Sequence, residues 1–211
     1  MHTNDLISKA RNEIGVCEVP ANSNNVKYNT WFYGKNVEGA KYPWCCAFIS
    51  WLFKSEPKLC KRTASCADLL DWFEKKGRIT PEPKPGDIVF FKFSTNNRKT
   101  NHVGLVIGSG PHMIRTIEGN TSQKSDDNGG KVMIRERQRN NLIVAYARPE
   151  YVDADKIPVK IEKKPVDVIV QEVIEGKWGS GNNRKTKLNL AGYDYKEIQD
   201  KVNAKLKEEK T

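Results

Sequence analysis

Histidine is scarce in this chain, and long hydrophobic runs are absent. The 211 residues include only His2, His102 and His112, and no segment reaches the roughly 18 consecutive apolar residues that would span a bilayer. We therefore expect neither a histidine-rich metal site nor insertion into a membrane. The residues up to Asn12 are polar, so we also expect no signal peptide and synthesis in the cytoplasm.

The cysteines show no paired spacing of the kind that binds metals. Their number is odd, and the chain carries no export signal, so we expect at least one free thiol rather than a disulfide framework. The five are Cys17, Cys45, Cys46, Cys60 and Cys66.

Negative charge is also in deficit, because 26 Asp and Glu face 36 Lys and Arg, for a formal net charge of +10. This excess favours polyanionic partners: nucleic acid, anionic lipid or a bacterial wall. No basic helix, RNA-binding aromatic pair or zinc motif supports a nucleic-acid binder. Residues 166–211 hold nine Lys and Arg against eight Asp and Glu, so +9 belongs to residues 1–165.

Helical patterns come first along the chain. Leu6, Ile7, Ala10 and Ile14 recur at helical spacing, and the polar stretch 21–39 predicts an irregular segment. Two further helices are predicted, one over 45–53 and one after Ser65.

Strand patterns follow the Pro85-Gly86 turn. Five apolar segments rich in β-branched and aromatic residues are separated by Asn, Gly, Ser and Asp loops. They lie at 87–93, 102–108, 113–119, 131–137 and 143–149. Helices followed by an antiparallel sheet predict an α+β domain.

A charged segment separates this domain from the C-terminal part. Pro149 to Pro165 contains eight charged residues and three prolines, a composition typical of an exposed linker. Beyond it, an apolar stripe over 166–174, a short helix over 184–190 and a last helix capped by Asp194 predict a three-helix bundle. The expected domains are 1–149 and 166–211, with 150–165 as the linker.

Cys45 is the candidate nucleophile. It follows Tyr42-Pro43-Trp44 at the predicted start of a helix, where the helix dipole favours a thiolate. The alternative is that Cys45 is a small hydrophobic core residue.

His102, Glu118 and Asn120 are candidate partners. His102 begins a strand, where its ring can stand at the end of the sheet. Glu118 and Asn120 are two residues apart, so in an extended strand their side chains point the same way, and a carboxylate there can orient an imidazole. The alternatives are a packing histidine and a polar turn.

Four motifs in this order resemble the CHAP domain of phage lysins and bacterial autolysins, a relative of the papain-like NlpC peptidases. They are YPWCCAFISW, KPGDIVFF, NHVGLVIG and IEGN, within residues 3–149. The resemblance implies a papain-like fold in which Cys45 is the nucleophile, His102 the base and then acid, Glu118 the orienting group and Asn120 a supporting polar group. Trp44 stands where many members have Gln, which leaves the second oxyanion donor open.

No cofactor is implied. Some CHAP domains carry an aspartate-rich calcium loop before the cysteine, but the corresponding stretch here has no Asp or Glu between Ala21 and Asn36. We expect no metal site there.

The C-terminal part resembles the choline-independent cell-wall-binding repeat of phage lysozymes, known as CW_7. GKWG, RK..L and AGYDY carry the resemblance over 166–206, and one copy is present. It implies recognition of the muramyl peptide of peptidoglycan, with Trp178 stacking on a sugar, Arg184 pairing with a carboxylate and Tyr193 contributing. The alternative is that Trp178 and Tyr193 form the core of the small bundle.

Together the resemblances imply a phage endolysin that cleaves an amide bond of peptidoglycan by cysteine catalysis and is held to the anionic wall by its C-terminal repeat. An N-acetylmuramoyl-L-alanine amidase is slightly favoured over an endopeptidase of the stem or cross-bridge, by analogy alone. A non-catalytic wall-binding protein is the alternative of another class. The enzyme would stay in the host cytoplasm until lysis releases it to the wall.

Overall fold

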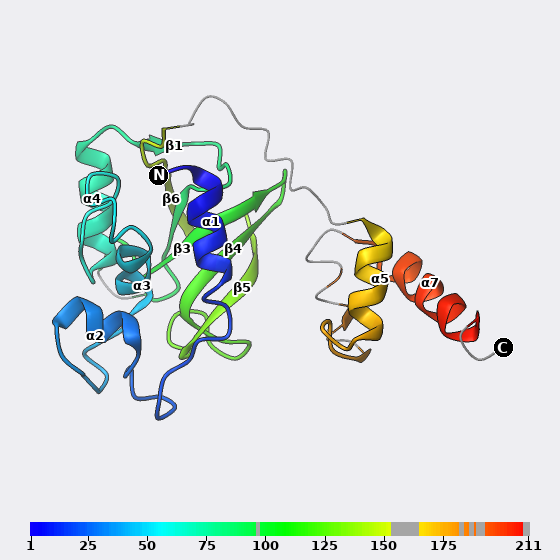
Figure 1. Ribbon diagram of the computed structural model, residues 1–211. Coiled ribbons are helices and arrows are strands. Elements are labelled where there is room, and N and C mark those ends of the chain that lie inside the picture. The colour runs from blue at the N-terminus through cyan, green and yellow to red at the C-terminus, as the bar shows by residue number, and fades with distance from the viewer. Residues whose placement is uncertain (96–97, 153–164, 182–183, 186–187, 189–192, 209–211) are drawn as a thin grey trace. The chain divides into compact units, whose positions relative to one another are not determined.

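The computed structural model describes residues 1–95, 98–152, 165–181, 184–185, 188 and 193–208. The chain divides into two compact units, Met1–Ile157 and Pro158–Thr211, and each is described by itself. Figure 1 shows helices and a sheet in the first unit and helices in the second.

Four helices occupy the N-terminal part of the first unit: α1 (Thr3–Arg11), α2 (Lys27–Tyr33), α3 (Cys45–Leu52) and α4 (Cys66–Lys75). Ser65 caps α4, because its hydroxyl accepts the Asp68 N–H at 3.3 Å. Two expectations were wrong. Ile14 lies beyond the end of α1 and is exposed, and α2 forms inside the stretch predicted to be irregular.

One sheet of six antiparallel strands follows in the order β1-β6-β2-β3-β4-β5. The strands are β1 (Ile79–Thr80), β2 (Ile88–Phe91), β3 (His102–Ser109), β4 (Met113–Thr121), β5 (Lys131–Gln138) and β6 (Ile143–Ala147). The predicted α+β class is confirmed, and five strands match predicted segments. The two-residue β1 was not predicted, because it is too short to show alternation.

Alternate residues of the strands separate the two faces of the sheet. Phe90 on β2 and Leu105 on β3 pack with the helices in the main core, whereas the residues that follow them, Phe91 and Val106, belong to a smaller cluster with Ile114. His102 alternates with Val103, and its ring lies 6.0 Å from that of Phe91. The histidine is therefore on the face of the sheet that carries the smaller cluster.

In the second unit the structure describes α5 (Val166–Ile174) and α7 (Tyr195–Glu208), which pack together. Their core consists of Ile169, Val170, Val173, Leu188, Ile198 and Val202. Asp194 caps α7 by accepting the Glu197 N–H at 2.9 Å. The predicted helix over 184–190 falls largely outside the described residues, so the three-helix arrangement stays a prediction.

Within the described ranges, no helix combines the length and the apolar character that crossing a membrane requires.

Candidate active site

Cys45 is the first residue of α3, at the position where backbone N–H groups have no partner within the helix. Gly119 on β4 allows this helix end to approach the sheet. A Cβ at Gly119 would lie 2.7 Å from Trp44 and 2.9 Å from Phe48. The glycine in the IEGN motif thus brings the cysteine to the strand that carries Glu118.

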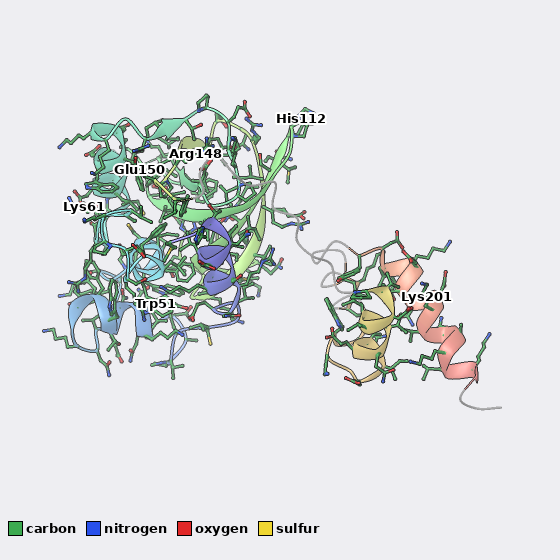
Figure 2. All side chains as sticks on the ribbon, turned by 45° about the horizontal axis from the view of Figure 1, so that its top comes forward. Trp51, Lys61, His112, Arg148, Glu150 and Lys201 are labelled. Carbon is green, nitrogen blue, oxygen red and sulfur yellow. The ribbon has the colours of Figure 1, made fainter. Side chains whose placement is uncertain are left out.

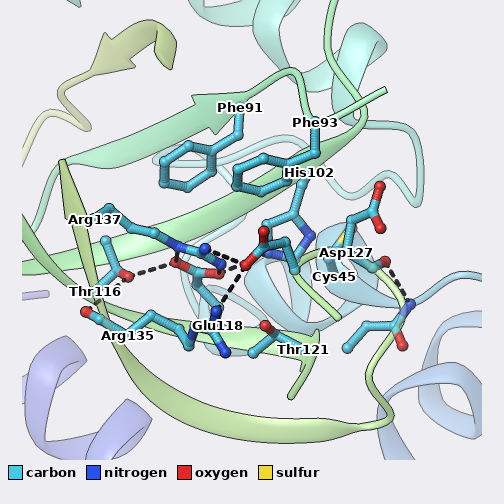
Figure 3. A network of polar contacts seen from close by, with 12 residues as sticks. Cys45, Phe91, Phe93, His102, Thr116, Glu118, Thr121, Asp127, Arg135 and Arg137 are labelled. Atoms are coloured by element: carbon cyan, nitrogen blue, oxygen red, sulfur yellow. Dashed lines mark hydrogen bonds and ion pairs between the residues drawn. The ribbon is translucent and has the colours of Figure 1, made fainter. Parts of the chain in front are cut away.

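His102 is fully buried at the start of β3 and points toward Glu118 (Figure 3). Its Nε2 lies 2.9 Å from Glu118 Oε2, and because an ionised carboxylate only accepts, the imidazole N–H donates. Nδ1 has no hydrogen-bond partner within the described part of the chain. The Cys45 thiol lies beside the same ring (Figure 3).

The pKa of His102 reflects opposing effects. Burial lowers it, but the interactions of the ring with the neighbouring Cys45 and with Glu118 outweigh burial and raise the pKa to about 9. The imidazolium is therefore stabilised at neutral pH. This is the form that can pair with a thiolate and later donate a proton to a leaving group.

Glu118 is fully buried, and both of its oxygens are engaged. Oε1 accepts from Thr116 Oγ1 at 2.6 Å and from Arg137 Nε at 2.9 Å, while Oε2 accepts from Arg137 Nη2 at 2.5 Å. Burial raises the pKa of Glu118, but Arg137 and His102 reverse this and lower it to about 2. Gly104 provides the space, because a Cβ there would lie 2.7 Å from Glu118 Cγ.

A second thiol lies against the candidate nucleophile. Cys45 Sγ and Cys66 Sγ are 3.5 Å apart, and Cys66 is the first residue of α4. The hydrogen bond with Cys66, together with burial, raises the pKa of Cys45 well above its usual value, and His102 is the group that lowers it. Ionisation of Cys45 therefore depends on the imidazole.

Asn120 is placed differently from the expectation. Its φ of 58° is left-handed, so the strand is not extended there, and the condition under which its side chain would point the same way as that of Glu118 is not met. Its Oδ1 accepts the Gly130 N–H at 3.3 Å, and its Nδ2 donates to the Asp127 carbonyl at 3.4 Å. Asn120 thereby holds the loop between β4 and β5.

Arg137 was missed by the sequence reasoning. It lies on β5, and its guanidinium also contacts Phe91 and Phe93, at 5.4 and 4.8 Å from the ring centres. The KVMIRERQ pattern could have indicated it, because Arg135 and Arg137 recur on one face of a predicted strand. No spacing rule, however, connects that strand to Glu118.

The predicted wall-binding residues have partners within the second unit. Trp178 and Tyr193 pack edge to face, 6.2 Å between ring centres, against its apolar core. Trp178 Nε1 donates to Glu172 at 3.0 Å, and Arg184 Nη1 donates to Gln199 at 3.1 Å. These contacts support the packing alternative for the two rings and leave a binding role for all three residues as a proposal.

Among the residues with described positions, no group of three or more His, Cys, Asp or Glu side chains is arranged to hold a metal ion.

Comparison with known proteins gives two family matches: the CHAP domain over residues 37–120 and the CW_7 repeat over residues 167–206. The CHAP match includes Cys45, His102, Glu118 and Asn120, and it ends before Arg137. A search of curated proteins finds no match.

Solved structures give more distant matches. The endolysin LysIME-EF1 is 13% identical, with 73% of this chain and 67% of that chain covered and a TM-score of 0.46. Ly7917 is also 13% identical, with 71% and 63% covered and a TM-score of 0.44. The chain thus spans less than two thirds of the length of Ly7917. A match to the CHAP domain over residues 37–120 followed by a match to the CW_7 repeat over residues 167–206 supports a peptidoglycan hydrolase.

Proposed function

We propose that this protein hydrolyses an amide bond of bacterial peptidoglycan with the Cys45 thiol as the nucleophile. One observation carries the proposal: a cysteine at a helix N-terminus lies beside an imidazole whose other nitrogen is held by a buried carboxylate at 2.9 Å. This arrangement of nucleophile, base and orienting group is the one that acyl transfer requires.

The chemistry proceeds in two steps. His102 takes the thiol proton, and the Cys45 sulfur attacks the carbonyl carbon of the substrate. The C–N bond then breaks as the imidazolium gives its proton to the leaving amine, and a thioester remains. In the second step His102 removes a proton from water, the hydroxide attacks the thioester, and the thiol is regenerated with a free carboxylate.

The N-terminus of α3 supplies stabilisation for the oxyanion. Its first backbone N–H groups point out of the helix beside the sulfur, as the geometry of a helix end dictates. Trp44 does not supply the second donor through its indole, because Nε1 already donates to Glu18 Oε1 at 2.7 Å.

We further propose that the second unit holds the enzyme to the wall. The CW_7 match supports this role, with Trp178, Arg184 and Tyr193 as the candidate contacts. The excess positive charge of residues 1–165 would add attraction to the anionic wall. We also propose that the protein is an endolysin that remains in the host cytoplasm until lysis.

For the bond, we propose cleavage between muramic acid and L-alanine, by analogy with other CHAP domains. Purified walls digested with the protein and analysed by mass spectrometry should show glycan strands without peptide and new N-terminal alanine. A new terminus within the stem or cross-bridge would identify an endopeptidase instead. If the wild-type protein releases no more than Cys45→Ala does, the protein is a wall binder and the enzymatic proposal fails.

A further inference from the structure

The strongest feature not used by the proposed mechanism is the guanidinium of Arg137. Only 9% of the residue is exposed, and it makes a two-point contact with Glu118, through Nε to Oε1 at 2.9 Å and through Nη2 to Oε2 at 2.5 Å. A guanidinium fork of this kind fixes the plane of a carboxylate as well as its charge. Figure 3 shows Arg137 and His102 on opposite sides of Glu118.

Glu118 Oε2 is shared by the guanidinium and the imidazole. It accepts from Arg137 Nη2 and from His102 Nε2, so the position of the imidazole depends on where the guanidinium holds that oxygen. Thr116 adds a third donor at 2.6 Å, to Oε1. With both oxygens occupied, the carboxylate has no freedom to rotate away from the ring.

Arg137 is itself held on two sides. Its Nη1 donates to Asp126 Oδ1 at 2.5 Å, in the loop between β4 and β5. Phe91 and Phe93 stack at 5.0 Å and cover both the guanidinium and the His102 ring, which lies 5.6 Å from Phe93. These rings exclude water, which strengthens the contacts beneath them.

We propose that Arg137 is a positioning residue of this site, which acts through Glu118 to hold the His102 imidazole in line with the Cys45 sulfur. The proposal rests on the function proposed above. It assigns Arg137 no contact with substrate.

Several ionisable groups lie around His102 or its network and affect its titration. Cys45 faces it from the start of α3, with the Cys66 thiol against Cys45, and Glu118 faces it from β4. Asp126 and Arg135 complete the network around Arg137, 2.7 Å apart. The histidine titration therefore has to be followed in matched variants rather than inferred from one.

The test replaces Arg137 by lysine, which keeps the buried positive charge and removes the fork. Since this protein contains three histidines, an NMR titration can follow His102, assigned by comparison with His102→Ala. With its carboxylate no longer held, the imidazole loses a contact that raises its pKa, so the pKa should fall by about 0.5 to 1 unit. The rate of wall hydrolysis should fall by about 10- to 100-fold, because a misplacement near 1 Å has that effect.

Arg135→Lys is the matched control. Arg135 lies two residues earlier on β5 and also binds Asp126, but it does not contact Glu118 in the described network. In Arg135→Lys the hydrolysis rate should therefore stay within about twofold of wild type, and the His102 pKa should not shift. If Arg135→Lys shifts the His102 pKa as far as Arg137→Lys does, the loop and not the fork positions the site, and the proposal is overturned.

A double variant keeps the proposal testable even if Arg137→Lys alone is unstable. In a Glu118→Gln background, adding Arg137→Lys should change neither the His102 pKa nor the hydrolysis rate, because Arg137 acts through that carboxylate. A further loss in the double variant would mean that Arg137 acts independently of Glu118.

The two proposals fail in different ways. Should wild type release no wall fragments while Arg137→Lys still lowers the His102 pKa, the proposed function fails and the role of Arg137 stands. Should wild type hydrolyse walls while the His102 pKa is the same in Arg137→Lys, the role of Arg137 fails alone.

Discussion

The two units of this chain use buried polar groups for different purposes. In the first, His102 and Glu118 are fully buried, and their pKa values move to about 9 and about 2. In the second, Trp178 and Arg184 are partly buried and donate to side chains of their own unit. The perturbed, water-excluded groups of the first unit are of the kind that the proposed proton transfer would use. The second offers a small apolar core and surface contacts, which suit recognition without reaction.

A second buried ion pair of the first unit differs from the one at Glu118. Figure 2 labels Arg148, which makes a two-point contact with the buried Asp87 at 2.8 and 2.7 Å. Burial exceeds the effect of Arg148 there and raises the pKa of Asp87, whereas Glu118 has two cationic partners and its pKa falls. No imidazole contacts Asp87 in the described network. The pKa of a buried carboxylate paired with an arginine therefore depends on whether a second cationic group lies beside it.

Replacing the proposed nucleophile should have the largest effect, because it should remove hydrolysis by the first unit and leave wall binding by the second. We expect Cys45→Ala to lower wall hydrolysis by more than about 1,000-fold, because the sulfur forms the bond to substrate. Wall binding through the second unit should persist. Turbidity loss of susceptible cells and a wall pull-down measure the two properties.

Cys46→Ala is the control for that variant. Cys46 is the next residue of α3 and projects about 100° away around the helix, into the core. It should retain at least a tenth of the activity. An inactive Cys46→Ala with an active Cys45→Ala would place the nucleophile one residue later, and lysis by the double variant would exclude a thiol mechanism.

The histidines give the next largest effect. His102→Ala should be as inactive as Cys45→Ala, since no other described imidazole meets the thiol. His112 is exposed at the turn between β3 and β4 (Figure 2). Because His102 is the first residue of β3 and His112 follows its last, His112→Ala should be nearly silent. Rates on purified walls decide this, and full activity of His102→Ala would favour a binding module.

Glu118→Gln should retain a small fraction of activity and change its pH dependence. The amide can still hold the imidazole but does not stabilise its positive charge. Because Glu118 raises the pKa of His102, the alkaline limb of activity, near pH 9 in wild type, should move toward pH 6.5. An unmoved limb would show that another group sets it.

The sequence predicted the parts of this site that are local. A cysteine after Tyr-Pro-Trp at a helix start and a histidine at a strand start follow from capping and periodicity, and the structure places Cys45 and His102 side by side. The β-strands were predicted for the same reason: alternation is visible within each segment.

What the sequence missed is nonlocal. Arg137 reaches Glu118 across the sheet, although in the strand register it pairs with Ile114. The left-handed Asn120 and helix α2 depend on packing that no short pattern reveals. The 3.5 Å contact of Cys45 with Cys66 joins two helix ends that lie 21 residues apart in the chain.

Separating the units should give a more moderate effect. A fragment ending near residue 160 should hydrolyse walls but bind them more weakly, and its adsorption should fall steeply with salt because it carries the excess positive charge. The tail, 166–211, is almost neutral, so its binding should survive salt. Pull-downs of each fragment at low and high salt test this. Salt-insensitive binding by the first fragment, with none by the tail, would place specificity in the catalytic unit.

The smallest expected effect concerns Cys66. Its hydrogen bond raises the pKa of Cys45, so Cys66→Ala should lower that pKa and increase the thiolate fraction at neutral pH. Alkylation of Cys45 by iodoacetamide, followed by peptide mapping, should become about three- to tenfold faster.

Cys60→Ala is the matched control for this measurement. Cys60 is another buried cysteine of the same core, and its thiol donates to the Lys61 carbonyl at 3.7 Å. Losing a sulfur at either position leaves a similar small cavity, so a general loosening of the core would accelerate alkylation in both variants. Acceleration in Cys66→Ala alone shows that the second thiol restrains the nucleophile. Equal rates in wild type and Cys66→Ala would mean that His102 and burial alone govern the ionisation of Cys45.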